Sequence, residues 1–556
     1  IYKEIGTGKR ISLTKLAVEH LEQRGRPLRI AIDISIWQFQ VQAARGGSNP
    51  AIRTLFYRLL RLLSLSIQPI FVFDGPNKPV FKRHKRSGRG DGVATSMAKR
   101  LLRLFGFRIH DAPGEAEAEC ALLQLNGIVD AVLSEDVDTI MFGCTRTLRN
   151  WSAEGSKGSK TPTHVSMYDT QELSQGETGL DREGMVLVAL MSGGDYIPEG
   201  IPGAGVKVAC EAARAGFGKS LCRLKGSDTS GLEEWRENLI HELQTNESRF
   251  FRTKHKALIV PEDFPNLEVL RYYTHPVVSA TSSLAKLETQ SWNKPLDVLG
   301  LREFVRETFD WEYRGGAIKF IRVLAPSLLV RKIMDLDQLQ DSQTRNNENI
   351  EEAHSRLVKA ITNRRIHFST DATPELRVSF APTDIVGYNF EEEPEEEISY
   401  GRDGLALNSD DEFEALADED EAEAVAKPRS RKPFNPTEPD LSWIPETVAK
   451  LGIPLMVEDW EEAQRAKASR KKLKASAKPK PKGKLGGMHI GALDRYVKVT
   501  KSLPATMVVE ATSALEKPSS PTNPWTIAGS QPSPRGTKTK YASNNTFEAI
   551  LISSSP

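Results

Sequence analysis

Cysteine is scarce in this sequence, with four in 556 residues. They stand apart from one another, at Cys120, Cys144, Cys210 and Cys222. None belongs to a CxxC pair, and none has zinc-finger spacing with a histidine. The pattern excludes a disulfide-stabilised scaffold and a zinc finger, and it predicts reduced, buried thiols in an intracellular protein.

Long apolar runs and net charge are missing as well. No run approaches the roughly 18–20 apolar residues of a membrane-spanning helix, so we expect no membrane partner. The 75 Lys and Arg residues balance the 74 Asp and Glu residues, and the net charge alone therefore indicates no class of partner. The chain begins with Ile1 rather than Met, and we expect a few native residues to precede it.

Short β-rich runs alternate with helical patterns through the first 335 or so residues. The runs at 28–35, 68–75 and 130–138 are typical of strands, whereas 52–65 and 94–107 have the periodicity of amphipathic helices. Strands that alternate with helices predict an α/β fold with a central, mostly parallel sheet.

The composition changes after about residue 340. Residues 364–387 are typical of two or three short strands, and 454–474 of a helix. An acidic insertion at 391–424 lies between them, and Lys, Pro, Ser, Thr and Gly dominate from 475 onward. We expect the insertion and the tail to be disordered.

Carboxylates follow three of the predicted strands. Asp33 ends the first, Asp74 ends the second, and Asp136 and Asp138 follow the third. Ligands of an open α/β sheet bind at the carboxyl ends of its strands. The sequence therefore predicts that these acids meet at one edge of the sheet.

Three more acids belong to the same pattern. Glu115 and Glu117 open a helix, and Asp195 follows another helical run. Residues i and i+2 do not share a helix face, so the two glutamates converge only if Glu115 lies in the cap region. Clustered carboxylates repel one another unless a cation compensates them, and Mg²⁺ prefers such ligands. Each acid taken alone also suits a turn or a helix cap, and the pattern leaves both interpretations open.

A basic insertion at 76–93 interrupts the sheet pattern. Its cations are Lys78, Lys82, Arg83, Lys85, Arg86 and Arg89. A solvated loop would have this composition, and so would a segment that covers a phosphate and stabilises charge in a transition state.

Two further features favour nucleic-acid binding. Residues 200–208 place glycines at a turn that opens a helix containing Lys207, where backbone N–H groups can bind phosphate. An ordinary tight turn would look the same. Trp37, just after Asp33, suits either core packing or stacking on DNA bases.

The motifs as a set resemble the flap endonuclease/XPG family of structure-specific nucleases. The segments "AIDIS", "FVFDG", "GEAEAE", "SEDVDTIMFG" and "GGDYIPEGIPGAGVK" occur in the order of that family over 28–220. The resemblance implies a PIN-like nuclease core with a helix–two-turn–helix at 184–220. It also implies a magnesium-dependent endonuclease that cuts branched DNA by a two-metal mechanism.

The resemblance also assigns residues by position. It implies one metal site made of Asp33, Asp74, Glu115 and Glu117, and a second made of Asp136, Asp138 and Asp195. It implies a catalytic basic pair, Lys82 and Arg89, and a DNA-binding set of Trp37, Gly203, Gly205 and Lys207. Mn²⁺ is an alternative metal, and K⁺ is expected at the 200–205 turn. Glu119 and Glu135 match no ligand position of the family.

Within the family, the chain resembles the eukaryotic, fungal-like Holliday junction resolvases. The stretch between "FDG" and "GEAEAE" is short, 292–326 is similar to that branch, and 354–474 resembles a chromodomain. This implies a nuclear enzyme of recombination and repair that makes paired, symmetrical nicks. Because each protomer has one active site, it implies a homodimer on the junction and a monomer off it. The alternatives are a 5′-flap or repair-bubble nuclease, a catalytically silent junction-binding scaffold and a chromatin adaptor.

The expected organisation has five segments. These are an N-terminal nuclease region (1–110), an internal nuclease region (111–225), a helical extension (226–340), a chromodomain-like module (354–474) and a tail (475–556).

Overall fold

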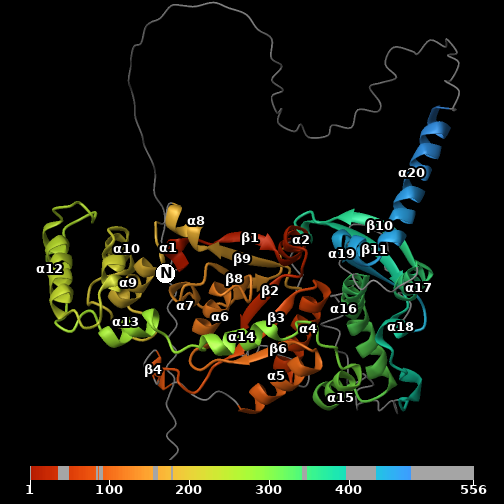
Figure 1. Cartoon of the computed structure of the whole chain (residues 1–556), viewed down its shortest axis with the longest axis horizontal. Coiled ribbons are helices and arrows are strands. Elements are labelled where there is room, and N and C mark those ends of the chain that lie inside the picture. Colours follow the sequence, from red (N-terminus) through yellow and green to blue (C-terminus); the bar gives the residue numbers. More distant parts are fainter. Residues whose placement is uncertain are drawn as a thin grey trace, which may run out of the picture. The chain divides into compact units, whose positions relative to one another are not determined.

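The computed structural model describes most of the chain up to residue 476 (Figure 1). The described residues are 2–34, 49–79, 81–82, 85–86, 92–154, 161–176, 179–340, 347–395 and 434–476. Trp37, Arg89, most of the acidic insertion and the tail from 477 lie outside these ranges. Within them, no helix combines the length and the apolarity needed to cross a bilayer.

A seven-stranded, mostly parallel sheet forms the centre, as predicted, in the order β1-β9-β8-β7-β2-β3-β6. Strands β8, β7, β2, β3 and β6 are parallel to one another, and β9 and β1 add an antiparallel edge next to β8. The strands are β1 (Lys9–Ser12), β2 (Arg29–Asp33), β3 (Gln68–Phe73), β6 (Arg108–Asp111), β7 (Ala131–Leu133), β8 (Arg146–Ser152) and β9 (His164–Asp169).

Both faces of this sheet are buried, which explains its continuous apolar strands. Alternate residues of β2 point to opposite faces, so Ile30 and Ile32 join one core cluster and Ala31 joins the other. The first cluster includes residues of α2 (Leu13–Arg24), α4 (Pro50–Ser64), α5 (Gly92–Leu104), α15 (Val298–Phe309) and α16 (Arg314–Gln340). The second includes residues of α6 (Ala116–Leu125), α7 (Asp138–Met141) and α8 (Thr170–Gln175).

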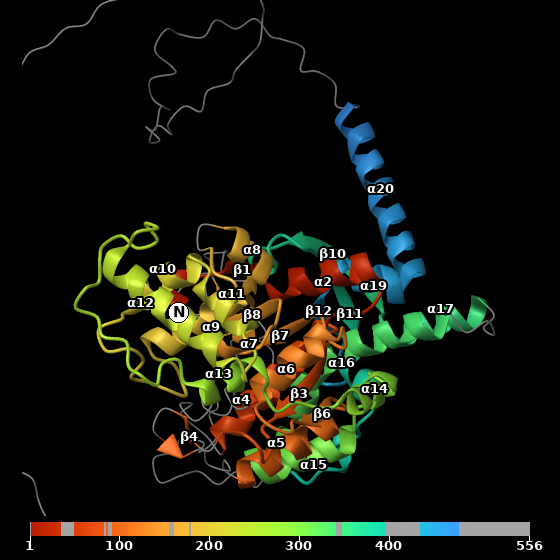
Figure 2. The same cartoon turned by 60° about the vertical axis from the view of Figure 1, so that its left-hand side comes forward.

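The predicted helix, glycine-rich turn and helix contribute residues to the second cluster. They are α9 (Arg182–Ser192), α10 (Val206–Arg214) and α11 (Phe217–Arg223), with the turn between α9 and α10. Further helices are α12 (Thr229–Thr245), α13 (Leu267–Thr274) and α14 (Thr281–Thr289). Figures 1 and 2 show α9, α10 and α12 together on one side of the sheet, away from the C-terminal strands.

The C-terminal module is a three-stranded antiparallel sheet in the order β10-β11-β12. Its strands are β10 (Ala360–Ile366), β11 (Pro374–Phe380) and β12 (Asp440–Pro445), and its helices include α18 (Pro382–Val386), α19 (Glu446–Gly452) and α20 (Pro454–Ser476). The prediction placed two or three strands in 364–387, but the third strand lies after the acidic insertion. Pro382 starts a helix instead, because proline lacks a ladder donor and suits a first helical turn.

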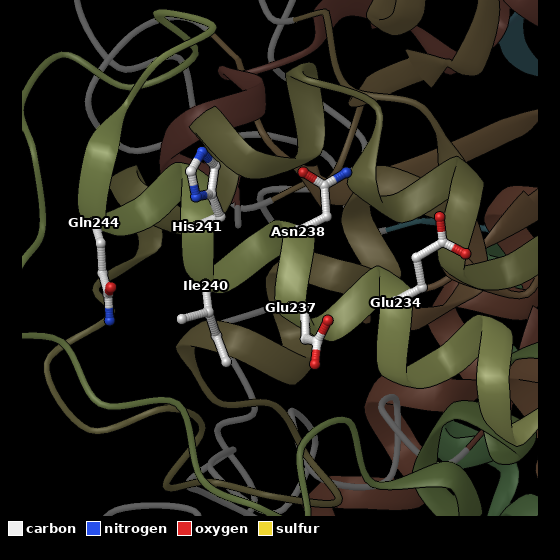
Figure 3. Close-up of a pocket in the computed structure, with 6 residues that line it drawn as sticks. All are labelled: Glu234, Glu237, Asn238, Ile240, His241 and Gln244. Atoms are coloured by element: carbon white, nitrogen blue, oxygen red, sulfur yellow. The ribbon is translucent and has the colours of Figure 1, made fainter.

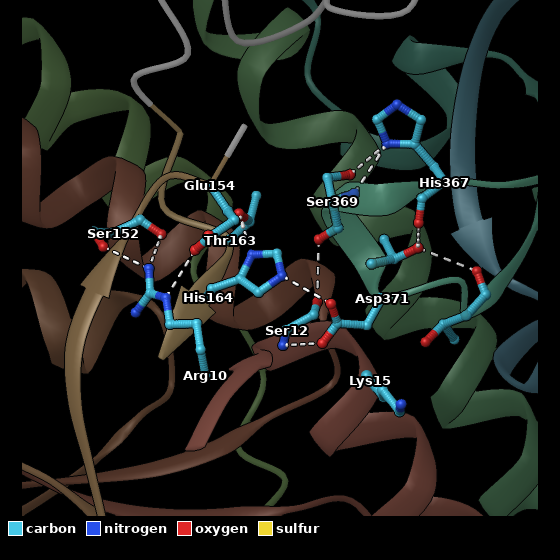
Figure 4. A network of polar contacts seen from close by, with 12 residues as sticks. Arg10, Ser12, Lys15, Ser152, Glu154, Thr163, His164, His367, Ser369 and Asp371 are labelled. Carbon is cyan, nitrogen blue, oxygen red and sulfur yellow. Dashed lines mark hydrogen bonds and ion pairs between the residues drawn. The ribbon is translucent and has the colours of Figure 1, made fainter. Parts of the chain in front are cut away.

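The module packs against the antiparallel edge of the central sheet (Figure 4). Asp371 Oδ2 accepts a hydrogen bond from the Ser12 backbone N–H at 2.7 Å, and its Oδ1 lies 3.1 Å from His164 Nε2. The Ser12 hydroxyl donates to the Ser369 carbonyl at 3.1 Å. Phe380 and Ile444 of the module belong to the same core cluster as α4 and α16. The module and the central sheet therefore share one hydrophobic core.

Candidate metal centre

Three neighbouring parallel strands bring carboxylates to one edge of the sheet. Asp33 is the last residue of β2, Asp74 directly follows β3, and Asp136 and Asp138 follow β7. Strand β2 pairs with both β3 and β7, so these strand ends are adjacent. Asp33 is fully buried there. The predicted convergence of the strand-end acids on this edge thus follows from the strand order.

Helix α6 adds two glutamates to the same edge. Glu115 is its N-cap residue, with extended backbone (φ −80°, ψ 139°), and Glu117 lies in its first turn. The cap conformation lets both carboxylates reach one cation, because Lys82 Nζ lies 3.4 Å from Glu115 Oε1 and 3.1 Å from Glu117 Oε1. Asp74 fixes the start of α6, since its Oδ1 accepts the Ala116 N–H at 2.9 Å.

A second group consists of Asp136, Asp138 and Asp195. Each offers one oxygen within 4.8 Å of the others, an arrangement able to hold a metal ion. The turn after β7 orients two of them: Asp136 Oδ1 accepts the Asp138 N–H at 3.0 Å, and the Ser134 hydroxyl accepts the Asp136 N–H at 3.1 Å. Asp195 comes from the segment after α9.

Lys82 joins the two groups into one cluster. It comes from the short strand β4 (Phe81–Lys82) in the basic insertion, which pairs with β5 (Lys85–Arg86). Besides the two glutamates, its ammonium lies 3.5 Å from Asp195 Oδ2 and 3.9 Å from Asp136 Oδ2. A single positive charge thus compensates carboxylates from both groups.

The electrostatics of the cluster favour a further cation. Burial raises the pKa of Glu117 well above its usual value, although Lys82 acts in the opposite direction. Burial, and then the neighbouring Asp136, raise the pKa of Asp138. The Oδ2 atom of Asp138 is buried without a hydrogen-bond partner among the described residues. Burial opposes the charge of Lys82, but Glu117 and Glu115 outweigh it and raise its pKa. Ionised carboxylates with too little compensation are suitable ligands for divalent magnesium.

Tyr196 is a residue of the site that sequence reasoning missed. Its hydroxyl donates to Glu115 Oε2 at 2.5 Å, and its ring lies 5.8 Å from Lys82 Nζ. The rings of Tyr272 and Tyr273 pack against it at centroid distances of 5.2 and 5.0 Å. The available signal was its position directly after Asp195. Tyr196 holds the Glu115 carboxylate in place.

Glu119 and Glu135 make contacts elsewhere. Glu119 is fully buried and receives the Ser279 N–H at 2.9 Å, with His110 Nε2 at 2.6 Å. Glu135 accepts the Asn150 N–H at 2.8 Å and pairs with Arg149. These interactions account for two acids that the family pattern left aside.

The predicted DNA-binding residues are only partly described, because Trp37 lies outside the described ranges together with Arg89 of the basic pair. Gly203 has a left-handed φ of 86°, and Gly205 is the N-cap residue of α10. An added Cβ would meet no atom within 4 Å at either glycine, so this turn exposes its backbone. Lys207 is exposed in the first turn of α10.

A surface depression in Figure 3 lies elsewhere and does not contribute to the cluster. All its lining residues belong to α12: Glu234, Glu237, Asn238, Ile240, His241 and Gln244. It includes two glutamates and none of the predicted ligands. The outward side of α12 is therefore acidic and would repel a polyanion.

Three family models match the chain. They are the XPG N-terminal domain over residues 7–109, the XPG I-region over 106–195, and the Holliday junction resolvase Gen1 C-terminal domain over 357–463. The first two contain all seven predicted metal ligands, and the third matches the C-terminal module.

Solved structures and curated proteins point the same way. A eukaryotic junction-resolving enzyme GEN-1 with caesium is 58% identical, with TM-score 0.71, over 84% of this chain and 99% of its own. The Holliday junction-resolving enzyme GEN1 with product DNA and Mg²⁺ is 58% identical, with TM-score 0.67, over 84% and 98%. Flap endonuclease 1-A of Oryza sativa subsp. japonica is 30% identical over 50% of this chain and 74% of its own. Human flap endonuclease GEN homolog 1 is 31% identical over a stretch that covers 34% of this chain and 23% of the human protein.

Proposed function

Because the chain belongs to the XPG/flap endonuclease family of structure-specific nucleases, we propose that it is a magnesium-dependent endonuclease that resolves four-way DNA junctions. The observation that carries this proposal is the carboxylate cluster around Lys82, built from three strand ends, α6 and the segment after α9. The similarity of the chain to a junction-resolving enzyme also extends over the C-terminal module. This supports the junction-resolving branch of the family.

The carboxylates would hold two metal ions. One ligand set would be Asp33, Asp74, Glu115 and Glu117, and the other would be Asp136, Asp138 and Asp195, the three acids whose oxygens already lie within 4.8 Å of one another. When bound, two Mg²⁺ ions activate a water and stabilise the leaving oxygen of a phosphodiester. Mn²⁺ is an alternative to Mg²⁺.

Basic and backbone groups would bind the DNA. Lys82 pairs with the carboxylates in this structure. Its ammonium would pair with the scissile phosphate once metal ions compensate these carboxylates. Arg89 would assist it, and Trp37 would stack on a base. The phosphate backbone of the duplex would be bound by Gly203, Gly205 and Lys207, with K⁺ at the 200–205 turn.

Paired nicks require two active sites. The described residues of each protomer hold one such cluster. Two copies would therefore act on one junction, whereas the free protein would be a monomer. The enzyme would work in the nucleus, in recombination and repair. Mass photometry tests the stoichiometry: a free monomer and two copies per junction are expected, and one copy per junction with complete resolution would contradict it.

Substrate preference decides between the branches of the family. A four-way junction and a 5′ flap, each end-labelled, are incubated with the protein and Mg²⁺ and separated on denaturing gels. Symmetrical, religatable nicks in the junction are expected. Cleavage of the flap with the junction intact would overturn the proposal in favour of a flap nuclease, and junction binding without cleavage would favour a scaffold.

A further inference from the structure

A basic loop at 248–256 follows α12, and it contains no acidic residue. Its cations are Arg249, Arg252, Lys254 and Lys256, and all four are exposed. The side chain of Arg252 retains 88% of its accessible surface even though it forms an ion pair. Four exposed cations in nine residues form a concentrated patch of one charge.

Hydrogen bonds at its start give this loop a fixed shape. The Asn246 side chain accepts the Phe251 N–H at 2.9 Å and donates to the Phe251 carbonyl at 2.6 Å. Glu242 of α12 is buried and accepts both the hydroxyl and the N–H of Ser248, at 2.7 and 3.1 Å. Farther on, the His255 N–H donates to the Leu243 carbonyl at 2.7 Å. The cations are therefore presented by an ordered backbone.

The loop is attached to α10, the helix that follows the glycine turn. Glu211 of α10 accepts the Arg252 N–H at 3.2 Å and lies 3.7 Å from the Arg252 guanidinium. Phe250 packs edge-on against Phe217 of α11 at 6.2 Å. Lys207 and Glu211 are four residues apart and share one face of α10, so the loop extends the face that carries Lys207. The ion pair between Arg252 and Glu211 also compensates the charge of Glu211, which would otherwise repel phosphate.

We propose that the basic loop 248–256 binds the phosphate backbone of double-stranded DNA, on a junction arm beyond the stretch held at the glycine turn. This rests on the proposed function, which supplies the DNA substrate. Glu211 lies about 6 Å farther along α10 than Lys207, and therefore farther from the glycine turn at the start of this helix. The contact is independent of base sequence, because Lys and Arg on a loop reach phosphates without reading base edges. The acidic outer side of α12 limits the surface on its other border.

The test measures junction binding by the full-length protein in EDTA, by fluorescence anisotropy over a range of salt concentrations. The variant is Lys254→Ala with Lys256→Ala. The control removes two exposed cations elsewhere, Lys286→Ala with Arg306→Ala. Lys254→Arg with Lys256→Arg keeps the charge and should bind as the wild type does.

The loop variant should bind a long-armed junction about ten-fold more weakly at low salt. The slope of log affinity against log salt concentration should become shallower by about two, as expected for two lost phosphate contacts. On a junction with trimmed arms it should bind as the control does. Affinity and salt dependence equal to the control on long arms would overturn the inference, and so would an equal loss on trimmed arms. Nicking of the same junction by the wild type in Mg²⁺ tests the proposed function separately. An absence of nicking would refute the proposed function and leave the binding result intact.

Discussion

At the scale of single residues, Asp138 combines burial with an unfavourable charge. It is 3% exposed, and burial and then Asp136 raise the pKa of its carboxyl. A carboxyl whose pKa is raised on folding destabilises the folded state once it ionises, and this cost shrinks as pH falls from the raised pKa towards the unfolded value. In the absence of a bound cation, the neutral form of Asp138 should therefore be the more stable one.

Asp138→Asn should therefore raise the thermal midpoint of the metal-free protein by a few degrees, which corresponds to about 1 kcal/mol. The same change should abolish most of the stabilisation that Mg²⁺ gives the wild type. Differential scanning fluorimetry in EDTA and in Mg²⁺ measures both. The exposed Asp263→Asn is the control and should change neither. A lower midpoint in EDTA together with an intact response to Mg²⁺ would contradict this.

Metal binding should depend on pH through the glutamates of α6. Metal ions need ionised ligands, and burial raises the pKa of Glu117 and Glu115. Affinity should be greatest above these raised values and fall as pH drops through them, well before the ordinary Glu value of about 4.3. Mn²⁺ binding followed by electron paramagnetic resonance measures this. An affinity that stays constant down to about pH 5 is the contrary result.

At the scale of elements, the loop after β3 and the loop before α6 lie against each other at Gly75. Its N–H donates to the Gly114 carbonyl at 2.7 Å, and an added Cβ would lie 1.9 Å from the Ala112 carbonyl oxygen. Both loops carry predicted ligands, Asp74 on one and Glu115 on the other. Their separation is set by the absence of a side chain at this position.

Gly75→Ala should force the two loops apart, with a loss of about 1–3 kcal/mol in stability. The Mg²⁺ concentration for half-maximal cleavage should rise. Gly226→Ala controls for adding a methyl group to a loop glycine, because nothing lies within 4 Å of its Cβ position and its backbone is not left-handed. Chemical denaturation and a Mg²⁺ titration of cleavage check both effects. An unchanged Mg²⁺ requirement would show that the ligands do not depend on this contact.

The elements near the sheet edge follow from the sequence because each is encoded locally. A buried apolar run ending in Asp predicts the positions of Asp33 and Asp74 without any tertiary information. The role of Tyr196 could not be predicted, because its partner Glu115 is 81 residues away in the sequence. The position of the third strand of the C-terminal module could not be predicted for a related reason. Its partner strand lies across the acidic insertion, and no local pattern links β11 to β12.

At the scale of the whole molecule, the C-terminal module is tied to the central sheet through Asp371 (Figure 4). Burial alone would raise the pKa of its carboxyl, but the Ser12 N–H and His164 lower it below its usual value. A lowered carboxyl pKa contributes stability above its unfolded value, near 3.9, and this contribution is lost as pH falls through the folded pKa. Asp371 therefore stabilises the docked module at neutral pH.

Asp371→Asn should lower the free energy of unfolding by about 1 kcal/mol at neutral pH, and the difference should vanish in acid. Asparagine tolerates the left-handed backbone at this position (φ 47°), so the change tests the charge. The control is Asp384→Asn, whose surface pair with Lys359 should contribute little. Equal stability of the two variants at neutral pH would show that the Asp371 contact does not hold the module.

The most direct measurement is single-turnover cleavage of an end-labelled four-way junction by the wild type and by Asp33→Asn, with Mg²⁺ or with EDTA, and with junction binding measured in parallel. Asp33 is the buried strand-end residue proposed as a metal ligand at this sheet edge. Paired nicks by the wild type in Mg²⁺ are expected, with none in EDTA and at least about 10²-fold slower cleavage by Asp33→Asn at unchanged binding. Cleavage that persists in EDTA, or that Asp33→Asn retains, would contradict a metal-dependent nuclease centre at this cluster.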